Sequence, residues 1–149
     1  MAVSRIAYPA AFQPEEGGAL TATFRDLPDA VTFGEGPDAA LAAVRDCLDE
    51  ALSFRIARHL DVPPPSAKRR GERLVAPPAL TAAKLALYIA QRMAGLSNVA
   101  LAARLGCHEG EVRRLLDPCH ASGLERLADA IRAAGGDLEL CLHAPRKSA

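Results

Sequence analysis

The segment from Leu96 to Leu116 constrains the fold of this chain more than any other, because it predicts two short helices joined by a tight turn. Small Ala102 lies where the second helix must pass close to the first, and Gly106 accommodates the positive φ that such a turn requires. The apolar residues expected to face inward recur at helical spacing: Leu101, Leu105, Val112, Leu115 and Leu116. This combination favours a helix-turn-helix; a plain two-helix hairpin in an alanine-rich chain is the alternative.

The second helix of this pair is predicted to read DNA, because Arg113 and Arg114 fall on its outward side. They are the candidates for base and phosphate contacts. Further candidate contacts in the same region are His108, Glu109, Asn98, Arg104 and Arg92. Glu109 is able to accept from a cytosine amino group, and both Glu109 and Glu111 are favourable at the positive end of the helix dipole. Alternatively, these two acids indicate a modest DNA affinity that depends on dimerisation.

Helices are also predicted on both sides of this pair. Thr81 is the expected N-cap of a helix that ends at Ala94, with Leu85, Ile89 and Met93 buried. The next two helices are expected from Asn98 to Leu105, capped by Ser97, and from His108 to Asp117, before Pro118. Ser122 to Glu125 has the spacing of a capping box. It is expected to open a helix that ends at Gly135 and buries Leu124, Leu127, Ala128 and Ile131. This four-helix core resembles the domains of phage repressors.

Residues 137–143 alternate strictly, which predicts a terminal strand with Leu138, Leu140 and Leu142 on one face. A lone strand leaves its own backbone groups unsatisfied and its leucines exposed. Pairing with the same strand of a second copy would place two recognition helices about one two-fold axis, which gives a dimer or a tetramer. Packing back on its own domain is the alternative.

The N-terminal half predicts an antiparallel meander. One face of the first strand is formed by Ile6, Tyr8, Ala10 and Phe12. Because Pro9 has no backbone N–H to donate, this strand is expected to lie at an edge of the sheet or to carry Pro9 on its unpaired side. The second and third strands are expected over 20–24 and 31–33, after turns at 14–18 and 27–29.

A long helix is predicted after the meander. Pro37 suits its first turn, and it is expected to end near His59, before the prolines at 63–65. One apolar stripe is expected to cover the meander: Leu41, Val44, Leu48, Leu52 and Ile56. A short strand over 73–76 completes a βββαβ domain. The sequence therefore predicts an α+β protein with one domain over 1–76 and an all-α helix-turn-helix domain with a C-terminal strand over 77–149.

The distribution of charge differs between the two halves, although the net charge is zero. Residues 1–65 carry five basic and ten acidic side chains, and residues 66–149 carry thirteen basic and eight acidic ones. A basic balance beside a groove-reading helix suits phosphate neutralisation, whereas an acidic domain suits a basic protein partner. Scatter of solvated charges is the alternative. No apolar run approaches the ~20 residues of a membrane helix, and no signal pattern precedes residue 30, so a cytoplasmic protein without a membrane partner is expected.

Metal binding and catalysis are not predicted. Cys47, Cys107, Cys119 and Cys141 contain no CxxC pair, so four reduced thiols are expected and no metal or cofactor. A nuclease of the RNase H type needs a carboxylate on its first strand, and residues 1–12 contain none. The acids of the N-terminal half that lie around turns are expected to stabilise those turns: Asp26, Asp29, Glu35 and Asp38. We therefore predict no catalytic residue.

The order of these features resembles the HicB family of antitoxins over roughly residues 5–143. Its most specific parts are Leu27 to Leu41, with the run VTFGEGPDAAL, and the segment over 113–136. The resemblance implies a partial RNase H-like N-terminal domain that blocks a small basic ribonuclease toxin of the HicA type. It also implies a C-terminal domain that binds the operator of the toxin–antitoxin operon. The alternative is a stand-alone transcriptional regulator whose N-terminal domain senses a ligand or dimerises.

Overall fold

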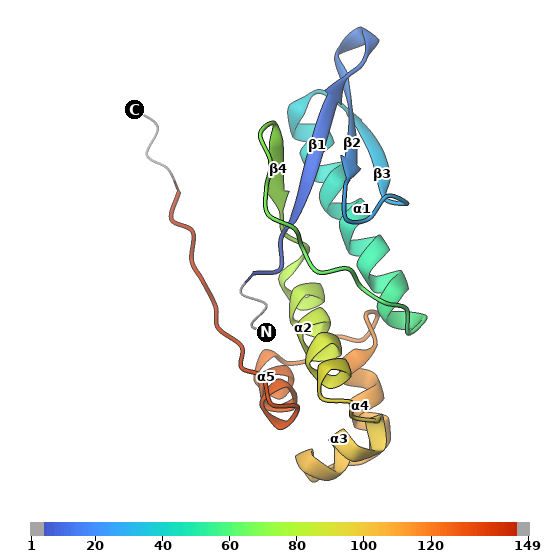
Figure 1. Ribbon diagram of the computed structural model, residues 1–149, viewed down its shortest axis with the longest axis vertical. Helices are drawn as coiled ribbons and strands as arrows, with labels where there is room; N and C mark the ends of the chain where they lie inside the picture. The colour runs from blue at the N-terminus through green and yellow to red at the C-terminus, as the bar shows by residue number, and fades with distance from the viewer. Residues whose placement is uncertain (1–4, 146–149) are drawn as a thin grey trace.

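The strands form one antiparallel sheet in the order β3-β2-β1-β4, in a computed structural model that describes residues 5–145 (Figure 1). Their bounds are β1 (Tyr8–Pro14), β2 (Ala19–Phe24), β3 (Val31–Glu35) and β4 (Glu72–Val75). Helix α1 (Pro37–Ala57) follows β3 and packs on β3 and β2. The predicted βββαβ order is confirmed. The ends of β2, β3 and β4 lie within two residues of their predicted positions, whereas β1 begins three residues after the start of the alternating segment over 5–12.

The N-terminal core lies between α1 and one face of the sheet. Tyr8 and Ala10 of β1 and Phe24 of β2 are almost fully buried there, and Ala10 lies opposite Phe24. The predicted stripe of α1 is confirmed at four positions, which are buried, while Leu41 is half-buried: Val44, Leu48, Leu52 and Ile56. Gly34 permits the close approach of β3 to α1, since a Cβ at this position would lie 2.3 Å from the backbone nitrogen of Ala40.

Pro9 does not place β1 at an edge of the sheet, so that part of the prediction is wrong. β1 lies between β2 and β4, and the edges are β3 and β4. Pairing with β2 begins at Ala10, and Pro9 lies opposite Leu74 of β4 only. A proline is tolerated inside the sheet because it lies where β2 has already ended.

The segment after α1 is tied to the sheet by polar contacts. The Tyr8 hydroxyl donates to the carbonyl of Pro63 at 2.8 Å, and burial raises the pKa of Tyr8 to about 12. Arg25 binds both carboxylate oxygens of Glu72 at 3.0 Å and thereby lowers the pKa of Glu72 to about 2. Asp26 accepts from the backbone N–H of Ser66 at 2.8 Å. These contacts bring the chain back across the sheet to β4.

The C-terminal half consists of four helices in the described part of the chain. They are α2 (Ala79–Met93), α3 (Asn98–Leu105), α4 (Glu109–Leu116) and α5 (Leu124–Ala133), which confirms the α+β fold class. Ser97 caps α3 as predicted, because its hydroxyl accepts from the N–H of Ala100 at 3.1 Å. The turn after α3 is left-handed at Gly106, with φ 65° and ψ 35°, again as predicted.

Two predicted helix caps are wrong. Helix α2 begins at Ala79, two residues before Thr81, and the Thr81 hydroxyl donates to Asp49 of α1 at 2.5 Å. Helix α5 has Gly123 as its N-cap, and no capping box forms because the Ser122 hydroxyl is engaged elsewhere. In both cases a contact with another helix takes the side chain that the local pattern assigned to a cap.

Some predicted core positions are also wrong. Met93 and Leu124 are exposed, and Ile89 is half-buried. Leu85 is buried as predicted, but so are Lys84, Leu87 and Tyr88. Helix α2 contacts α1, α4 and α5, so it buries residues on more than one side. None of the helices that the structure describes is both long and apolar enough to cross a membrane.

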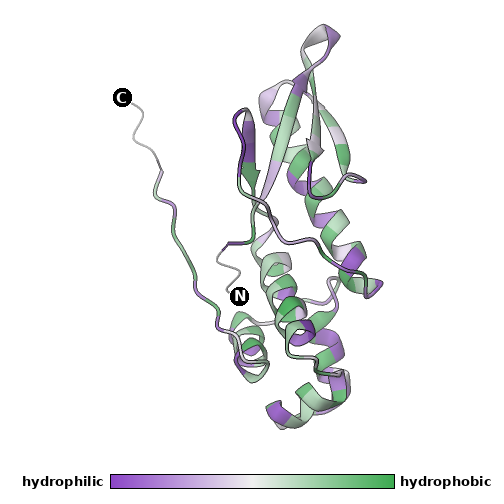
Figure 2. Cartoon of the chain, in the orientation of Figure 1, coloured by the Kyte–Doolittle hydropathy of each residue, from purple (hydrophilic) through white to green (hydrophobic). Residues whose placement is uncertain are grey.

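The predicted C-terminal strand is absent from residues 137–145 as the structure describes them. These residues run away from the helices without regular structure, although Figure 2 colours much of the segment as hydrophobic. Leu138 is half-buried against the core, but Leu140 is 77% and Leu142 is 89% exposed. A strand is defined by backbone hydrogen bonds to a neighbour, and no neighbouring strand is present here. Among the three leucines, the alternative of packing back on the same chain therefore holds only for Leu138, although the Arg5 guanidinium also lies 3.1 Å from the His143 ring.

Candidate nucleic-acid interface

Helices α3 and α4 and the turn between them form the candidate interface. The turn brings the apolar sides of the two helices together, and the residues buried there match the prediction except for half-buried Leu105. The buried residues are Leu101, Ala102, Val112, Leu115 and Leu116. Helices α2 and α5 pack against this pair, α2 on α4 and α5 on both α3 and α4 (Figure 1).

The carboxyl end of α4 is held by a buried lysine. Lys84 of α2 is fully buried, and its ammonium donates to the carbonyls of Arg114 and Leu115 at 3.1 and 3.0 Å. It also donates to the hydroxyl of Ser122 at 2.9 Å. The last carbonyls of a helix lack partners within the helix and carry its negative dipole end, so a cation is favourable at this position. Burial lowers the pKa of Lys84, and the Coulombic effect of Asp117 opposes that shift.

The amino end of α4 is tied to two other helices by side-chain hydrogen bonds. Asn98 of α3 accepts from the amide of Gln91 in α2 at 2.7 Å and donates to Glu109 at 3.4 Å. Glu109 also binds Arg113 one turn later, and this bond is the main cause of the lowered pKa of Glu109. Asn98, predicted as a DNA contact, is thus half-buried and positions α4 against α3.

The second acid of α4 is also paired within the protein. Glu111 binds Arg126 of α5 at 2.5 Å, and this hydrogen bond is the main cause of the lowered pKa of Glu111. Each acid that the sequence placed near phosphates therefore has its own arginine, so neither leaves an uncompensated negative charge on the outer side of α4.

The arginines predicted to contact DNA are exposed, but they differ in their partners. Arg113 is bound to Glu109, whereas the Arg114 guanidinium forms no hydrogen bond or ion pair with any residue that the structure describes. His108 is exposed at the N-cap of α4. Arg104 donates to the carbonyl of Ala133 at 3.1 Å, at the end of α5.

Arg92 lies apart from this group, at the junction between the two halves of the chain. It pairs with Asp61, and its guanidinium stacks 5.2 Å from the centre of the Tyr88 ring. The Tyr88 hydroxyl in turn donates to the carbonyl of Leu60 at 2.6 Å. Arg92 therefore connects α2 to the segment after α1.

Three residues with structural roles at this interface were missed by the sequence reasoning: Lys84, Gln91 and Arg126. The sequence did contain a signal for Lys84, because it is the only charged residue in the apolar run from Ala79 to Ala90. Its spacing of three and four residues from Leu87 and Tyr88 also places it on the buried side of α2. Gln91 lies seven residues after Lys84, on the same side of the helix. Arg126 carries no comparable signal, since its partner lies on another helix.

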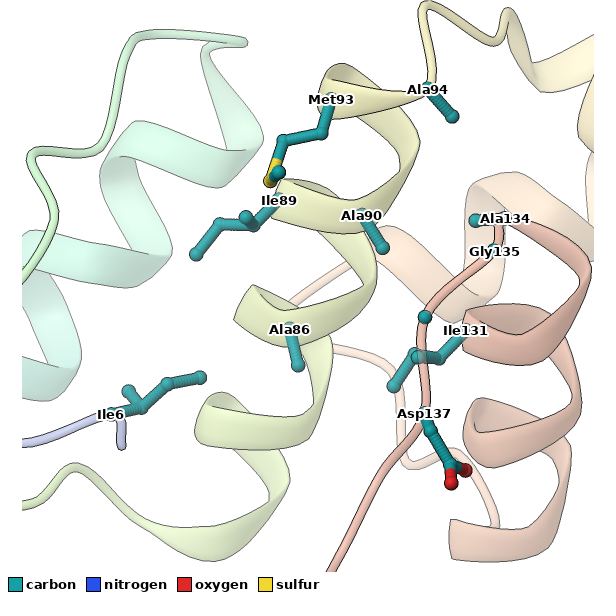
Figure 3. Close-up of a pocket in the computed structure, with 11 residues that line it drawn as sticks. Ile6, Ala86, Ile89, Ala90, Met93, Ala94, Ile131, Ala134, Gly135 and Asp137 are labelled. Carbon is teal, nitrogen blue, oxygen red and sulfur yellow. The ribbon is translucent and has the colours of Figure 1, made fainter. Parts of the chain in front are cut away.

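An open apolar cavity of about 700 Å³ lies beside α2, next to the point where the C-terminal segment leaves α5. Figure 3 shows Ile6, Ile89 and Met93 on one side of it and Ile131 with Asp137 on the other. The C-terminal segment with its exposed leucines thus begins at the edge of this apolar cavity.

Two of the four acids around the N-terminal turns, Asp26 and Asp29, contact neighbouring side chains. Asp26 binds Ser66, and Asp29 pairs with Arg55 of α1 at 2.6 Å. Among the described residues, no three His, Cys, Asp or Glu side chains gather as metal ligands, and the four cysteines are free thiols.

Comparison with known proteins finds antitoxins. A family model described as "HicB_like antitoxin of bacterial toxin-antitoxin system" matches residues 7–86. "Antitoxin HicB 2" of Photorhabdus laumondii is 35% identical to 89% of this chain, over 94% of its own length. "Antitoxin HicB" of Escherichia coli K12 is 29% identical to 91% of this chain, over 98% of its length. "Antitoxin HicB" of Pseudomonas fluorescens is 30% identical to 87% of this chain, over 90% of its length. The family match ends within α2 and does not reach α3 or α4.

Replacing Lys84 by methionine is expected to lower the free energy of unfolding by about 1–3 kcal/mol, because the carbonyls at the end of α4 lose a buried donor. The matched control is Lys68→Met in the exposed segment before β4, which is expected to change stability by less than ~0.5 kcal/mol. Urea denaturation followed by circular dichroism measures both. Equal stability of the two variants would show that the cost of burying the ammonium cancels its hydrogen bonds.

Proposed function

The chain belongs to the HicB-like antitoxin family, and we propose that it neutralises a small basic ribonuclease toxin of the HicA type and represses its own operon by binding operator DNA. The observation that carries this proposal is the family match over residues 7–86, followed outside the matched region by the two short helices α3 and α4 and the tight turn between them. In this proposal, residues 1–76 bind the toxin, and residues 77–149 bind DNA and dimerise. Its site of action is the cytoplasm, where both mRNA and the operator lie.

The N-terminal half acts in this proposal as an inhibitor and has no catalytic role. Its residues 1–65 carry ten acidic and five basic side chains, which suits a basic protein partner, and residues 66–76 add four basic and one acidic side chain. The structural contacts of Asp26 and Asp29 favour a binding role over metal-dependent hydrolysis, because a carboxylate that stabilises a turn is not free to hold a reactive cation.

The C-terminal half binds the major groove through α4. Arg114 is the foremost candidate contact, since its guanidinium is exposed and has no partner within the described residues. Arg113 reaches DNA by exchanging Glu109 for a phosphate or a base edge, and such an exchange is inexpensive for an exposed ion pair. His108 at the N-cap and Arg104 on α3 provide flanking contacts.

Two copies associate through the C-terminal segment. Exposed Leu140 and Leu142 continue from half-buried Leu138 at the edge of the apolar cavity beside α2. Pairing of this segment with its counterpart in a second chain satisfies the backbone groups of both and covers the leucines. The association also brings two recognition helices to adjacent half-sites of an operator.

The toxin-binding part of this proposal is tested by co-expression with the short basic reading frame next to the gene. Induction of that frame alone is expected to arrest growth and degrade mRNA, and co-induction of this chain is expected to restore both. Purified proteins are expected to form a complex in size-exclusion chromatography. Continued mRNA cleavage at equimolar protein would contradict the proposal.

For DNA, we expect Arg113→Ala and Arg114→Ala each to weaken operator binding, with Arg45→Ala on the exposed side of α1 as the matched control. Loss of a base contact costs ~1–3 kcal/mol, whereas loss of a phosphate contact lowers the salt slope by about one. Fluorescence anisotropy at three salt concentrations separates the two roles. Wild-type affinity in both variants would show that α4 is not the recognition helix.

For the C-terminal segment, we expect removal of residues 137–149 to lower the oligomeric state and the operator affinity while leaving toxin neutralisation intact. The double variant Leu140→Ser with Leu142→Ser is expected to have the same effect, because it removes the covered apolar area without shortening the chain. Leu60→Ser, at an exposed leucine far from this segment, is the control. Multi-angle light scattering measures the mass. An unchanged mass in both variants would place the dimer interface elsewhere.

A further inference from the structure

The face of the sheet that points away from α1 carries large exposed apolar side chains. The register places Phe33 of β3 opposite Thr21 of β2, and Val31 opposite Thr23. Phe33 is 70% and Val31 is 56% exposed, which is unusual for residues inside a strand. We call the surface formed by Val31, Phe33, Thr21 and Thr23 the Phe33 face.

Nothing in the described fold covers this face. Helix α1 packs on the opposite side of β3 and β2, and no other described helix has extensive contacts with these strands. β3 is also an edge of the sheet, so its outer backbone groups are free to meet another molecule. An aromatic ring beside an open strand edge is therefore available to a partner.

Three carboxylates lie at one end of the Phe33 face. Glu35 ends β3 and lies opposite Ala19 of β2. The backbone N–H of Glu15 donates to the carbonyl of Ala19 at 2.8 Å, which brings the turn with Glu15 and Glu16 to the same end of the sheet. All three side chains are exposed, and none forms an ion pair with a residue that the structure describes. The surface thus combines an apolar centre with unpaired negative charge at its rim.

We propose that the Phe33 face is the docking site for the basic toxin, an inference that rests on the proposed function. An apolar anchor surrounded by charges is the usual anatomy of a specific interface, in which the anchor slows dissociation and rim charges speed association. A basic partner supplies the positively charged side chains with which Glu15, Glu16 and Glu35 are not paired within the described protein. A second copy of this chain would bring another set of carboxylates, so the charge pattern favours the toxin over self-association.

The position of the Phe33 face also separates the two activities. In Figure 1 the β1–β2 turn and α3 lie at opposite ends of the long axis of the molecule. A toxin docked on the sheet therefore leaves α4 accessible, and the complex binds operator DNA with the toxin in place.

The test compares two phenylalanines of similar exposure in the full-length protein. Phe33→Ser is expected to weaken toxin binding about tenfold or more, through faster dissociation measured by surface plasmon resonance. Phe54→Ser is the matched control, since Phe54 is 54% exposed on α1 and contacts Arg58. This variant is expected to bind the toxin within about threefold of wild type. Both variants are expected to retain wild-type thermal stability and operator affinity.

Two further variants show whether a loss of toxin binding is due to misfolding, and they separate the contribution of the carboxylates from that of the apolar contact. Thr21→Arg places a bulky positive charge on the same face and is expected to repel the basic partner. The triple variant Glu15→Gln, Glu16→Gln and Glu35→Gln is expected to slow association several-fold at low salt and to bind with a weaker salt dependence.

The possible outcomes distinguish this inference from the function on which it rests. If wild-type protein binds the toxin and Phe33→Ser and Thr21→Arg bind equally well, the Phe33 face is not the docking site, although the proposed function stands. If the wild-type protein does not bind the toxin, both fail. A lower mass of free Phe33→Ser in light scattering, without loss of toxin binding, would assign the face to a second copy and overturn the inference.

Discussion

Helix α2 connects the two halves of this protein, and the buried ammonium of Lys84 attaches α4 to that helix. This ammonium holds the carbonyls at the end of α4, while Thr81, on the same helix and three residues earlier, donates to Asp49 of α1. Helix α2 thereby joins the unit made of the sheet and α1 to α4 through two polar contacts one turn apart. A buried cation loses the free energy of its hydration, and the interaction with the negative end of the α4 dipole offsets part of that loss. The orientation of α4 relative to the sheet thus depends on α2.

Pairing of acids within the helical half makes the two glutamates of α4 compatible with the proposed DNA binding. Glu109 is held by Arg113 and Asn98, and Glu111 by Arg126 of α5. These pairs hold the amino end of α4, since they join it to α3 and α5, whereas Lys84 holds its carboxyl end. The same pairs give the three arginines different roles. Arg126 stabilises the fold, Arg113 pairs with Glu109 but is exposed enough to reach a ligand, and Arg114 remains available to a ligand. The sequence alone could not make this division, because every partner except Arg113 lies on another helix.

The arrangement along the long axis assigns the two proposed activities to separate surfaces. The open face of the sheet, with Phe33 and its carboxylate rim, lies at one end, and α3 and α4 lie at the other (Figure 1). The C-terminal segment begins between them, beside the apolar cavity next to α2. The three proposed activities, which are toxin binding, DNA binding and association of two chains, are thus assigned to three different surfaces, so the proposal allows one molecule to carry out all three at once.

The sequence by itself determined the elements that local periodicity and backbone chemistry control. Alternation predicted the strands of the sheet, although the same signal over 137–143 predicted a strand that has no pairing partner. The stripe from Val44 to Ile56 fixed α1, and Ser97 and Gly106 fixed the limits of α3, because these signals act between residues close in the chain. Only the tertiary structure decided the partners of Lys84, Thr81 and Ser122, which the local pattern assigned to no role or to caps. It also decided that β1 lies inside the sheet and that Phe33 faces solvent. These outcomes depend on which elements meet, and a side chain contributes its hydrogen bonds to whichever neighbour the fold brings within about 3 Å.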